Sequence, residues 1–314
     1  LRIIKKDPML LEERLEKYYN RKPFYFYNPI TDEEVLNIIK KKKKGNKLPR
    51  YIPILSENRK VDRLVNTYKV SAKNINYLPK VLIIGMGFVG ITIALALARK
   101  NQEVIGYDIN NEVIKKLKKS KSHVDEPGIN SLIKKYNEEG KLKFTNSISN
   151  FNYDTYVICV GTPVDVNKTP NTRFLLSSLK DISRTIRPGN LIIIRSTVGL
   201  GTTRNIIIPE LERLTQLKVG KDIFVSFSPE RTVQGNALYE IENLPQLVSG
   251  FSSDCLYKSI DFWRQISNSV IQLDSLEACE LAKLANNSYR DLTFAFANGL
   301  SQICSNYQID SAKL

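Results

Sequence analysis

The sequence contains little cysteine, and its cysteines follow no recognisable spacing. Cys159, Cys255, Cys279 and Cys304 are widely separated, and none belongs to a CxxC pair. This arrangement argues against both a zinc site and a disulfide framework, and it favours a reducing compartment. We therefore expect a cytoplasmic protein that holds no metal.

Long apolar runs are also missing. No stretch of the chain reaches the roughly 18–20 consecutive apolar residues that a helix needs to cross a bilayer. The first ten residues, LRIIKKDPML, contain no apolar segment behind a basic start, so we see no secretory signal. The sequence gives no reason to expect a membrane as a partner.

Acidic residues are too few to balance the basic ones, because 32 Asp and Glu stand against 47 Lys and Arg and leave a formal net charge of +15. Such a chain favours anionic partners, which include dinucleotides and sugar nucleotides as well as nucleic acid. The densest basic patch is Lys40–Lys44, and no aromatic residue interleaves with it as binding of a single strand would require. We interpret this run as a solvated helix end or loop and do not expect nucleic acid to bind.

Composition and hydrophobic pattern divide the chain into three regions, residues 1–79, 80–268 and 269–314. The middle region alternates amphipathic segments with short, β-branched apolar runs that predict buried strands. Because helical patterns separate these strands, we expect an α/β fold, a Rossmann-type doubly wound parallel sheet with right-handed crossovers. The runs that predict strands are VLIIG, EVIGYD, TYVICVG, NLIIIRST and IFVSFSP.

The third region contains one long central helix pattern, residues 275–305, which has no proline and a single glycine, Gly299. It exceeds the usual length of a globular helix, so it should bridge domains or form a dimer interface. A helix that is apolar nearly all round must be buried. We therefore expect a homodimer formed through this helix, with these side chains in the interface: Leu281, Leu284, Leu292, Phe294, Phe296 and Leu300.

Residues 1–79 predict a small, basic α+β extension. DEEVLNIIKKKKK predicts a helix, and RYIPILSENRKVDRLV predicts a strand, a turn and a second strand. This order resembles half of a CBS nucleotide-sensing module, in which a helix is followed by such a hairpin. No second half follows, so the alternative is a basic extension of no known role.

A glycine-rich loop follows the first strand of the middle region. In VLIIGMGFVG, Gly85, Gly87 and Gly90 have the GxGxxG spacing, directly after a strand and at the start of a helix. Gly85 permits the tight turn, Gly87 lets the backbone approach a pyrophosphate, and Gly90 allows close packing of helix on sheet. Phe88 and Val89 begin the helix, whose free N–H groups and positive dipole end suit phosphates.

The glycine-rich loop and the start of the helix form a cradle for the cofactor, and an acidic residue completes it. Asp108 ends the second predicted strand, 23 residues after Gly85 (108 − 85), which is close to the roughly 20 expected in this fold. Its carboxylate would bind both ribose hydroxyls of NAD⁺ and would repel the 2′-phosphate of NADP⁺. The alternative is a glycine-tight turn without a ligand. We expect NAD as the cofactor.

Beyond the cradle, several strings resemble motifs of the UDP-glucose/GDP-mannose dehydrogenase family, in the family's order. The resemblance implies a nucleotide-sugar 6-dehydrogenase, which uses NAD⁺ to oxidise the C6 alcohol of a UDP-sugar to the uronate in two steps. The strings are DEPGI (Asp125–Ile129), CVGTPVD (Cys159–Asp165), RSTVGLGTT (Arg195–Thr203), SFSPERTVQG (Ser226–Gly235) and EACELAKLANNSYRDLTFAFANGLSQIC (Glu277–Cys304).

The resemblance assigns roles at two strand ends. Gly161, Thr162 and Pro163 would lie beside the cofactor, because ligands bind at the carboxyl ends of the strands in this fold. Thr197 would contact the cofactor and resembles the threonine that holds a catalytic water. The alternative for Thr197 is a hydroxyl that caps a strand.

The resemblance also assigns roles within SPER. Glu230 resembles the family's catalytic glutamate, used in general acid/base work, and Arg231 would contact the substrate. Because Glu230 follows an apolar strand, we expect burial to raise its pKa. The alternative is an ion pair between Glu230 and Arg231.

Three polar residues share one face of the long helix. Lys283, Asn287 and Arg290 follow i, i+4, i+7 spacing. In the family, the matching lysine and asparagine stabilise the oxyanion of the substrate, and an ammonium and an amide suit that task. All three would contact the sugar; a solvated polar stripe is the alternative. NSYRD and the residues after it are most similar to the branch that oxidises UDP-N-acetylmannosamine, with one departure at Gly299, where that branch has glutamate.

Two parts of the family's machinery are missing. The second oxidation passes through a thioester on a cysteine in a GFGGxCxxKD stretch, and a further domain holds the nucleotide. This sequence contains neither, so we expect a fragment that binds NAD⁺ and does not complete catalysis alone. Alternatives are a UDP-glucose 6-dehydrogenase, a β-hydroxyacid dehydrogenase and a non-catalytic NAD-binding or sensing module. SPER and NSYRD argue against the β-hydroxyacid dehydrogenase.

Overall fold

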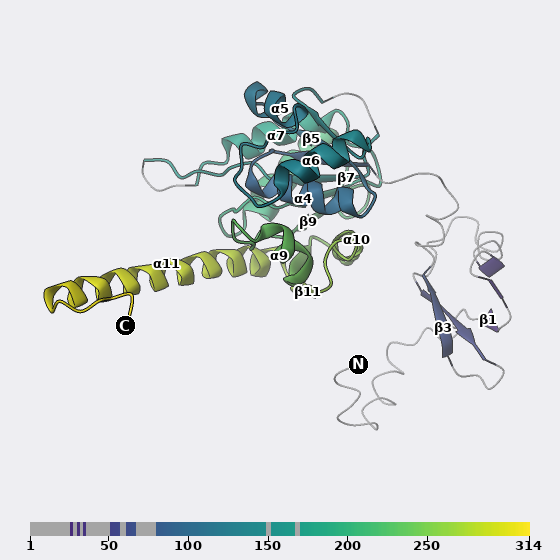
Figure 1. The fold of residues 1–314 in the computed structure, drawn as a ribbon. Helices are drawn as coiled ribbons and strands as arrows, with labels where there is room; N and C mark the ends of the chain where they lie inside the picture. Colours follow the sequence, from purple (N-terminus) through teal and green to yellow (C-terminus); the bar gives the residue numbers. More distant parts are fainter. Residues whose placement is uncertain are drawn as a thin grey trace. The chain divides into compact units, whose positions relative to one another are not determined.

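The computed structural model describes residues 26–27, 30–31, 34–35, 51–56, 61–66, 80–148, 152–166 and 170–314. The chain forms two compact units, Leu1–Tyr77 and Leu78–Leu314 (Figure 1), and each is described by itself. The Lys40–Lys44 run and most of the helix expected before it lie outside the described residues.

The first unit contains a three-stranded sheet. Strand β1 (Phe26–Tyr27) pairs in parallel with β2 (Tyr51–Leu55), which pairs antiparallel with β3 (Val61–Asn66). These last two strands confirm the strand pair expected between residues 50 and 65. Between β1 and β2, Thr31 and Glu34 form a capping box, in which the Thr31 N–H donates to Glu34 Oε2 at 2.8 Å and the Glu34 N–H donates to Thr31 Oγ1 at 3.2 Å.

The second unit is built on an eight-stranded sheet in the order β11-β10-β9-β8-β7-β4-β5-β6. The six strands from β9 to β6 are parallel, and β10 runs antiparallel to β9. The chain runs outward from β4 through β5 to β6 and then crosses back to β7, so the strand order reverses beside β4. This is the predicted Rossmann-type topology, and ligands bind at such a reversal. The strands are β4 (Lys80–Ile84), β5 (Glu103–Tyr107), β6 (Leu142–Thr145), β7 (Thr155–Ile158), β8 (Leu191–Ile194), β9 (Phe224–Phe227), β10 (Gln246–Gly250) and β11 (Val270–Gln272).

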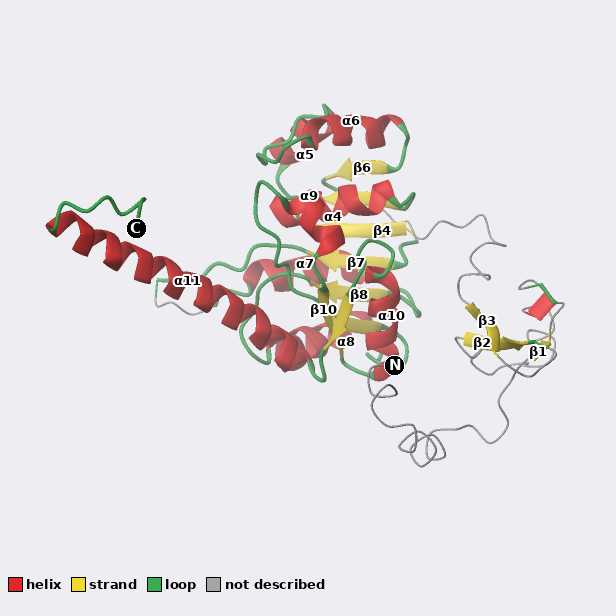
Figure 2. Ribbon diagram, turned by 60° about the horizontal axis from the view of Figure 1, so that its bottom comes forward, coloured by secondary structure: helices red, strands yellow, loops and turns green. Residues whose placement is uncertain are grey.

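Helices cover both faces of the sheet (Figure 2), which explains why its central strands are apolar without alternation. Val81 and Ile83 of β4 pack on one side with α4, α5, α6, α9 and α10, whereas Leu82 and Ile84 pack on the other with α7, α8 and the start of α11. The helices are α4 (Phe88–Arg99), α5 (Asn111–Lys118), α6 (Ile129–Glu138), α7 (Arg173–Ser183), a π-helical turn η1 (Thr203–Ile207) that continues into α8 (Ile208–Thr215), α9 (Ala237–Asn243), α10 (Ser253–Trp263) and α11 (Leu276–Asn306).

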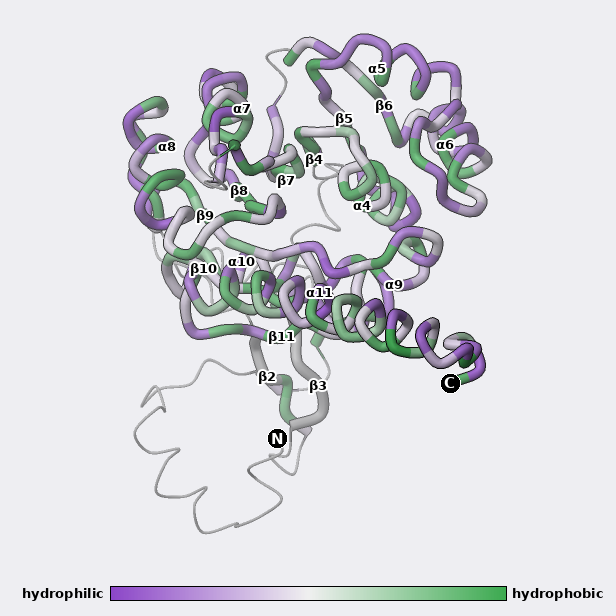
Figure 3. Tube along the Cα trace, turned by 90° about the vertical axis from the view of Figure 1, so that its left-hand side faces the viewer, coloured by the Kyte–Doolittle hydropathy of each residue, from purple (hydrophilic) through white to green (hydrophobic). Residues whose placement is uncertain are grey.

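Helix α11 has 31 residues and confirms the predicted long helix. Ser275 caps its start, since the side chain accepts a hydrogen bond from the Ala278 N–H at 3.0 Å. The first turns pack on the sheet, and the rest extends away from this unit (Figures 1 and 2). Hydrophobic residues recur along the extended part (Figure 3). None of the described helices combines the length and apolarity needed to cross a bilayer.

Candidate active site

The glycine-rich loop between β4 and α4 is shaped by two of its three glycines. Gly85 has φ +93°, and a Cβ there would lie 2.9 Å from the Cys159 carbonyl oxygen. A Cβ on Gly90 would lie 1.9 Å from the Gly85 carbonyl oxygen. Any side chain at either position would therefore push the loop away from β7 or from α4.

Gly87 has the opposite surroundings. A Cβ there would meet nothing within 4 Å. Gly87 is the N-cap of α4, no side chain caps the helix, and its first turn holds no acidic residue. The N–H groups of Phe88 and Val89 are thus left beside open space at the positive end of the helix dipole, an arrangement that suits a pyrophosphate.

Asp108 follows β5 and is half-buried beside this loop. Its Oδ2 accepts a hydrogen bond from the Met86 N–H at 2.8 Å, and its Oδ1 accepts one from the Asn110 N–H at 2.8 Å. The carboxylate is thereby fixed between the glycine-rich loop and the start of α5, where a ribose bound to the cradle would meet it.

The loops after β7 and β8 are tied together at the same edge of the sheet. The Thr162 hydroxyl donates to the Thr197 carbonyl oxygen. The Ser196 hydroxyl donates to the Val160 carbonyl oxygen at 2.6 Å. Gly161 and Pro163 are exposed at this rim, and Thr197 is half-buried. The cofactor residues expected from the second strand-end motif are therefore brought beside Thr197.

Glu230 lies in the next loop, after β9, and is only 7% exposed. Its Oε1 accepts hydrogen bonds from the N–H groups of Arg231 at 2.7 Å and Thr232 at 2.8 Å. Its Oε2 pairs with Arg195 Nη2 at 2.8 Å. Burial is the largest influence on the pKa of Glu230 and would raise it, but Arg195 and the two N–H groups hold the pKa below its ordinary value.

The expectation for the pKa of Glu230 is therefore wrong, and so is the alternative of an ion pair with Arg231. Its pKa is lowered instead of raised, because a guanidinium from the neighbouring strand outweighs the burial. Its ion-pair partner is Arg195 and not the adjacent Arg231, whose Nη2 donates to the Pro245 carbonyl oxygen at 2.5 Å.

Helix α11 carries the remaining candidate residues. Lys283 is half-buried, and burial lowers its pKa from the ordinary value, opposed by the charge of Glu230 and reinforced by Arg290. Asn287 Oδ1 is buried and has no hydrogen-bond partner within the described part of the chain. Arg290 is exposed. The structure thus brings Lys283 into electrostatic range of Glu230 and leaves the side-chain oxygen of Asn287 without a partner in the described part of the chain.

Residues 79–266 match the model of the UDP-glucose/GDP-mannose dehydrogenase family, NAD binding domain. The chain belongs to this family. Its cofactor is accordingly NAD, and the family consists of NAD-dependent nucleotide-sugar dehydrogenases.

Among curated relatives, the UDP-N-acetyl-D-mannosamine dehydrogenase of Pyrococcus horikoshii is 30% identical over 232 residues, covering 74% of this chain and 55% of the relative. The enzyme of the same name from Campylobacter jejuni is 30% identical over 242 residues, covering 75% and 59%. The chain therefore spans little more than half the length of these relatives.

Solved structures agree with this likeness. The UDP-N-acetyl-mannosamine dehydrogenase Cap5O of Staphylococcus aureus superposes with a TM-score of 0.67 at 28% identity, covering 74% of this chain and 57% of Cap5O. The GDP-mannose dehydrogenase of Pseudomonas aeruginosa superposes with a TM-score of 0.69 at 26% identity, covering 74% and 55%.

Two buried carboxylates hold this family domain together at the site, and sequence reasoning missed both. Glu280 of α11 is fully buried, and its two oxygens accept the N–H groups of Gly201 at 2.6 Å and Thr203 at 2.8 Å. Arg204 adds a salt bridge to Glu277 at 2.5 Å. These bonds dock α11 against the loop that carries Thr197 and so set the place of Lys283.

Glu126, in the DEPGI string, is the second such carboxylate. It is 5% exposed and accepts the N–H groups of Gly235 at 2.6 Å and Ala237 at 2.7 Å. Gln234 Nε2 also donates to the Asp125 carbonyl oxygen at 3.0 Å. The motif that resembled the family's EPGL thus fastens the loop after α5 to the loop that follows Glu230.

Cys159 and Cys279 lie near this site but do not suit a nucleophilic role. Burial raises the pKa of each thiol to about 12, so neither is a thiolate near neutral pH. All four cysteines are unpaired. Neither Cys159 nor Cys279 therefore suits the nucleophilic role that the sequence resemblance implies for a cysteine.

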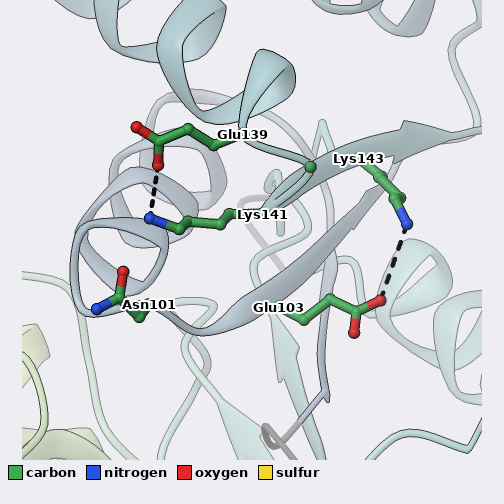
Figure 4. A pocket seen from close by; sticks show the side chains of 6 residues that line it. Asn101, Glu103, Glu139, Lys141 and Lys143 are labelled. Atoms are coloured by element: carbon green, nitrogen blue, oxygen red, sulfur yellow. Dashed lines mark ion pairs between the residues drawn. The ribbon is translucent and has the colours of Figure 1, made fainter.

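A depression of about 450 Å³ lies away from these residues (Figure 4). Its lining comes from the amino ends of β5 and β6, at the edge of the parallel sheet opposite to the glycine-rich loop. Lys141 pairs with Glu139 at 2.5 Å, and Lys143 pairs with Glu103 at 3.9 Å. None of the candidate cofactor or substrate residues lines this depression.

Proposed function

We propose that this chain is the NAD⁺-binding domain and central helix of a UDP-sugar 6-dehydrogenase whose substrate is UDP-N-acetylmannosamine. The observation that carries the proposal is that Lys283 of α11 lies within electrostatic range of Glu230, while Thr162 is bonded to the Thr197 carbonyl oxygen at neighbouring strand ends. The NSYRD string and the names of the relatives support this sugar over UDP-glucose, the alternative substrate. The domain limits 80–268 and 269–314, and a CBS-like extension over 1–79, remain predictions.

The cofactor cradle fits NAD⁺. The uncapped start of α4 and the open space over Gly87 suit its pyrophosphate, and Asp108 suits its ribose. When bound, NAD⁺ accepts the hydride that the sugar loses. Thr162 and the residues beside it would line the nicotinamide side of the site.

Lys283 and Asn287 would hold the substrate oxygen that becomes negative as hydride leaves. They lie one turn apart on α11, where the Lys283 ammonium and the side-chain N–H₂ of Asn287 would both donate to that oxygen. Because burial lowers its pKa, Lys283 is more readily neutral than a solvated lysine. Its neutral amine would accept the proton that the alcohol loses, and the ammonium formed would then hold the oxygen. Arg231 and Arg290 add positive charge that suits an anionic nucleotide sugar.

Glu230 would act as a base. Its lowered pKa keeps it ionised near neutral pH, and an ionised carboxylate accepts a proton. Water held beside Thr197 would lose a proton to it in the second oxidation, when the acyl group is released. A nucleophilic cysteine for that step would have to come from outside this chain.

Cofactor choice tests the cradle. We expect the chain to bind NAD⁺ at least tenfold more tightly than NADP⁺, because Asp108 would repel the 2′-phosphate. Calorimetric titration with both cofactors measures the ratio. Asp108→Asn keeps an oxygen for the Met86 N–H and removes the charge, so it should narrow the preference. Equal binding of the two cofactors by the unaltered chain would contradict the role of Asp108.

Self-association tests the proposed homodimer. One exposed stripe of α11, on the face opposite Lys283, comprises Tyr289, Leu292, Phe296, Leu300 and Ile303, with exposures of 37–74%. We expect the chain to be a dimer at micromolar concentration in analytical ultracentrifugation. Removing two large apolar side chains should weaken the dimer roughly 100-fold or more, at about 1.5–3 kcal/mol for each buried side chain.

The double variant Leu292→Ala with Phe296→Ala carries this test, and Asn298→Ala, which lies off the stripe, is its control. A monomeric unaltered chain, or equal association of the double variant and the control, would show that the stripe is not the interface.

A further inference from the structure

The candidate base, Glu230, forms an ion pair with the buried guanidinium of Arg195. Arg195 follows β8, is 2% exposed, and pairs with Glu230 through Nη2 at 2.8 Å. Its Nη1 donates to the Ser228 carbonyl oxygen at 3.0 Å and to Gln246 Oε1 at 3.0 Å. Its guanidinium carbon lies 4.3 Å from the ring centre of Trp263 in α10. One side chain is thus fixed by groups from β10, α10 and the loop after β9.

These contacts decide where the carboxylate points and which charge it has. The planar guanidinium offers its donors in a fixed fork, so its bonds to Ser228 and Gln246 set the direction of the remaining one toward Glu230. Stacking on Trp263 holds the plane of that fork. Glu230 Oε1 is held separately by two backbone N–H groups. Both oxygens of the Glu230 carboxylate therefore accept hydrogen bonds, one from Arg195 and the other from the backbone.

Two other titratable groups, besides Arg195, lie within electrostatic range of Glu230. Lys283 approaches from α11, and Cys159 lies at the end of β7. Cys159 stays a neutral thiol, because burial raises its pKa to about 12. Lys283 carries a charge that could also balance Glu230. A lysine committed to that ion pair would be less free to hold a substrate oxygen.

We propose that Arg195 is a positioning residue that serves as the counter-ion of Glu230, fixes the orientation of its carboxylate and leaves Lys283 free for the substrate. The inference rests on the proposed role of Glu230 as a base. It assigns to the RSTV string a function distinct from that of its threonine: the arginine acts through Glu230 and does not touch the sugar or the cofactor.

The single tryptophan of the chain makes the proposal measurable. Because Trp263 stacks on Arg195, its fluorescence should change when Glu230 takes up a proton and releases the guanidinium. We expect an acid transition in the unaltered chain that Glu230→Gln abolishes. In Arg195→Met the carboxylate loses its counter-ion while its burial remains, so its titration, followed by ¹³C NMR of labelled glutamate carboxyls, should move to higher pH.

Two variants serve as controls. Arg195→Lys keeps a positive charge, so its Glu230 titration should lie closer to that of the unaltered chain than Arg195→Met does. Arg231→Met removes an arginine from the same loop whose guanidinium bonds to Pro245, so it should leave the titration nearly unchanged. Circular dichroism over the same pH range identifies any unfolding.

An unchanged Glu230 titration in folded Arg195→Met would overturn the proposal. If Arg195→Met does not fold, the unaltered chain and Glu230→Gln decide: an acid fluorescence transition present in both refutes the coupling, and one lost in Glu230→Gln supports it. These measurements need no turnover. If the chain binds NAD⁺ but shows neither the fluorescence transition nor the shifted Glu230 titration, only the role of Arg195 is refuted. If the chain does not bind NAD⁺, the proposed function is refuted.

Discussion

Replacing Lys283 by alanine should lower kcat by about two to three orders of magnitude, the scale of losing one preorganised oxyanion donor. The assay requires a protein in which this chain continues through the remaining half of its relatives' length. Lys283 is half-buried on a docked helix and within electrostatic range of Glu230, so we expect little reorganisation of its ammonium when the substrate binds. A charge fixed in that way acts on the transition state more than on the bound sugar. KM should therefore change far less than kcat.

The measurement follows NADH formation with UDP-N-acetylmannosamine at saturating NAD⁺. Arg290→Ala is the matched comparison, because Arg290 lies on the same face of α11 but is exposed, and it should act mainly on KM. If Lys283→Ala raises KM and leaves kcat unchanged, the lysine is a binding residue and the catalytic role proposed for it is wrong.

Features that depend on neighbouring residues were predictable from the sequence. The glycine spacing after an apolar strand and Asp108 at the next strand end identify the cradle, because chain geometry alone brings them together in this fold. Periodicity placed Lys283 and Asn287 on one face of a helix. The ordered family strings then gave the strand-end loops.

Features that depend on distant pairs were not predictable. Arg231 adjoins Glu230 in the sequence, yet Arg195, 35 residues away, holds the carboxylate. The lowered pKa of Glu230 follows from that pair and could not be foreseen from the apolar strand before it. Glu126 and Glu280 bind backbone N–H groups, which any residue type supplies, so no sequence pattern reveals their partners. An arginine directly after four apolar residues was the one available hint of a buried charge.

Two glycines of the cradle should respond oppositely to the same added methyl group. Gly90→Ala places a carbon 1.9 Å from the Gly85 carbonyl oxygen, which is backbone and cannot move without opening the loop from the helix. We expect it to destabilise the domain by about 1–3 kcal/mol, the usual scale of overpacking, with a matching fall in the urea midpoint.

Gly87→Ala should leave the same domain as stable as before, because a Cβ at Gly87 meets nothing within 4 Å and its φ of −72° is open to alanine. The new methyl group would occupy the space over the start of α4 that the pyrophosphate needs. We expect NAD⁺ affinity to fall about 10- to 100-fold, which corresponds to about 1.4–2.8 kcal/mol. Calorimetry and urea unfolding of both variants separate the two effects. Gly87→Ala with unchanged affinity would mean that the dinucleotide does not cross this helix end, even though the chain binds it.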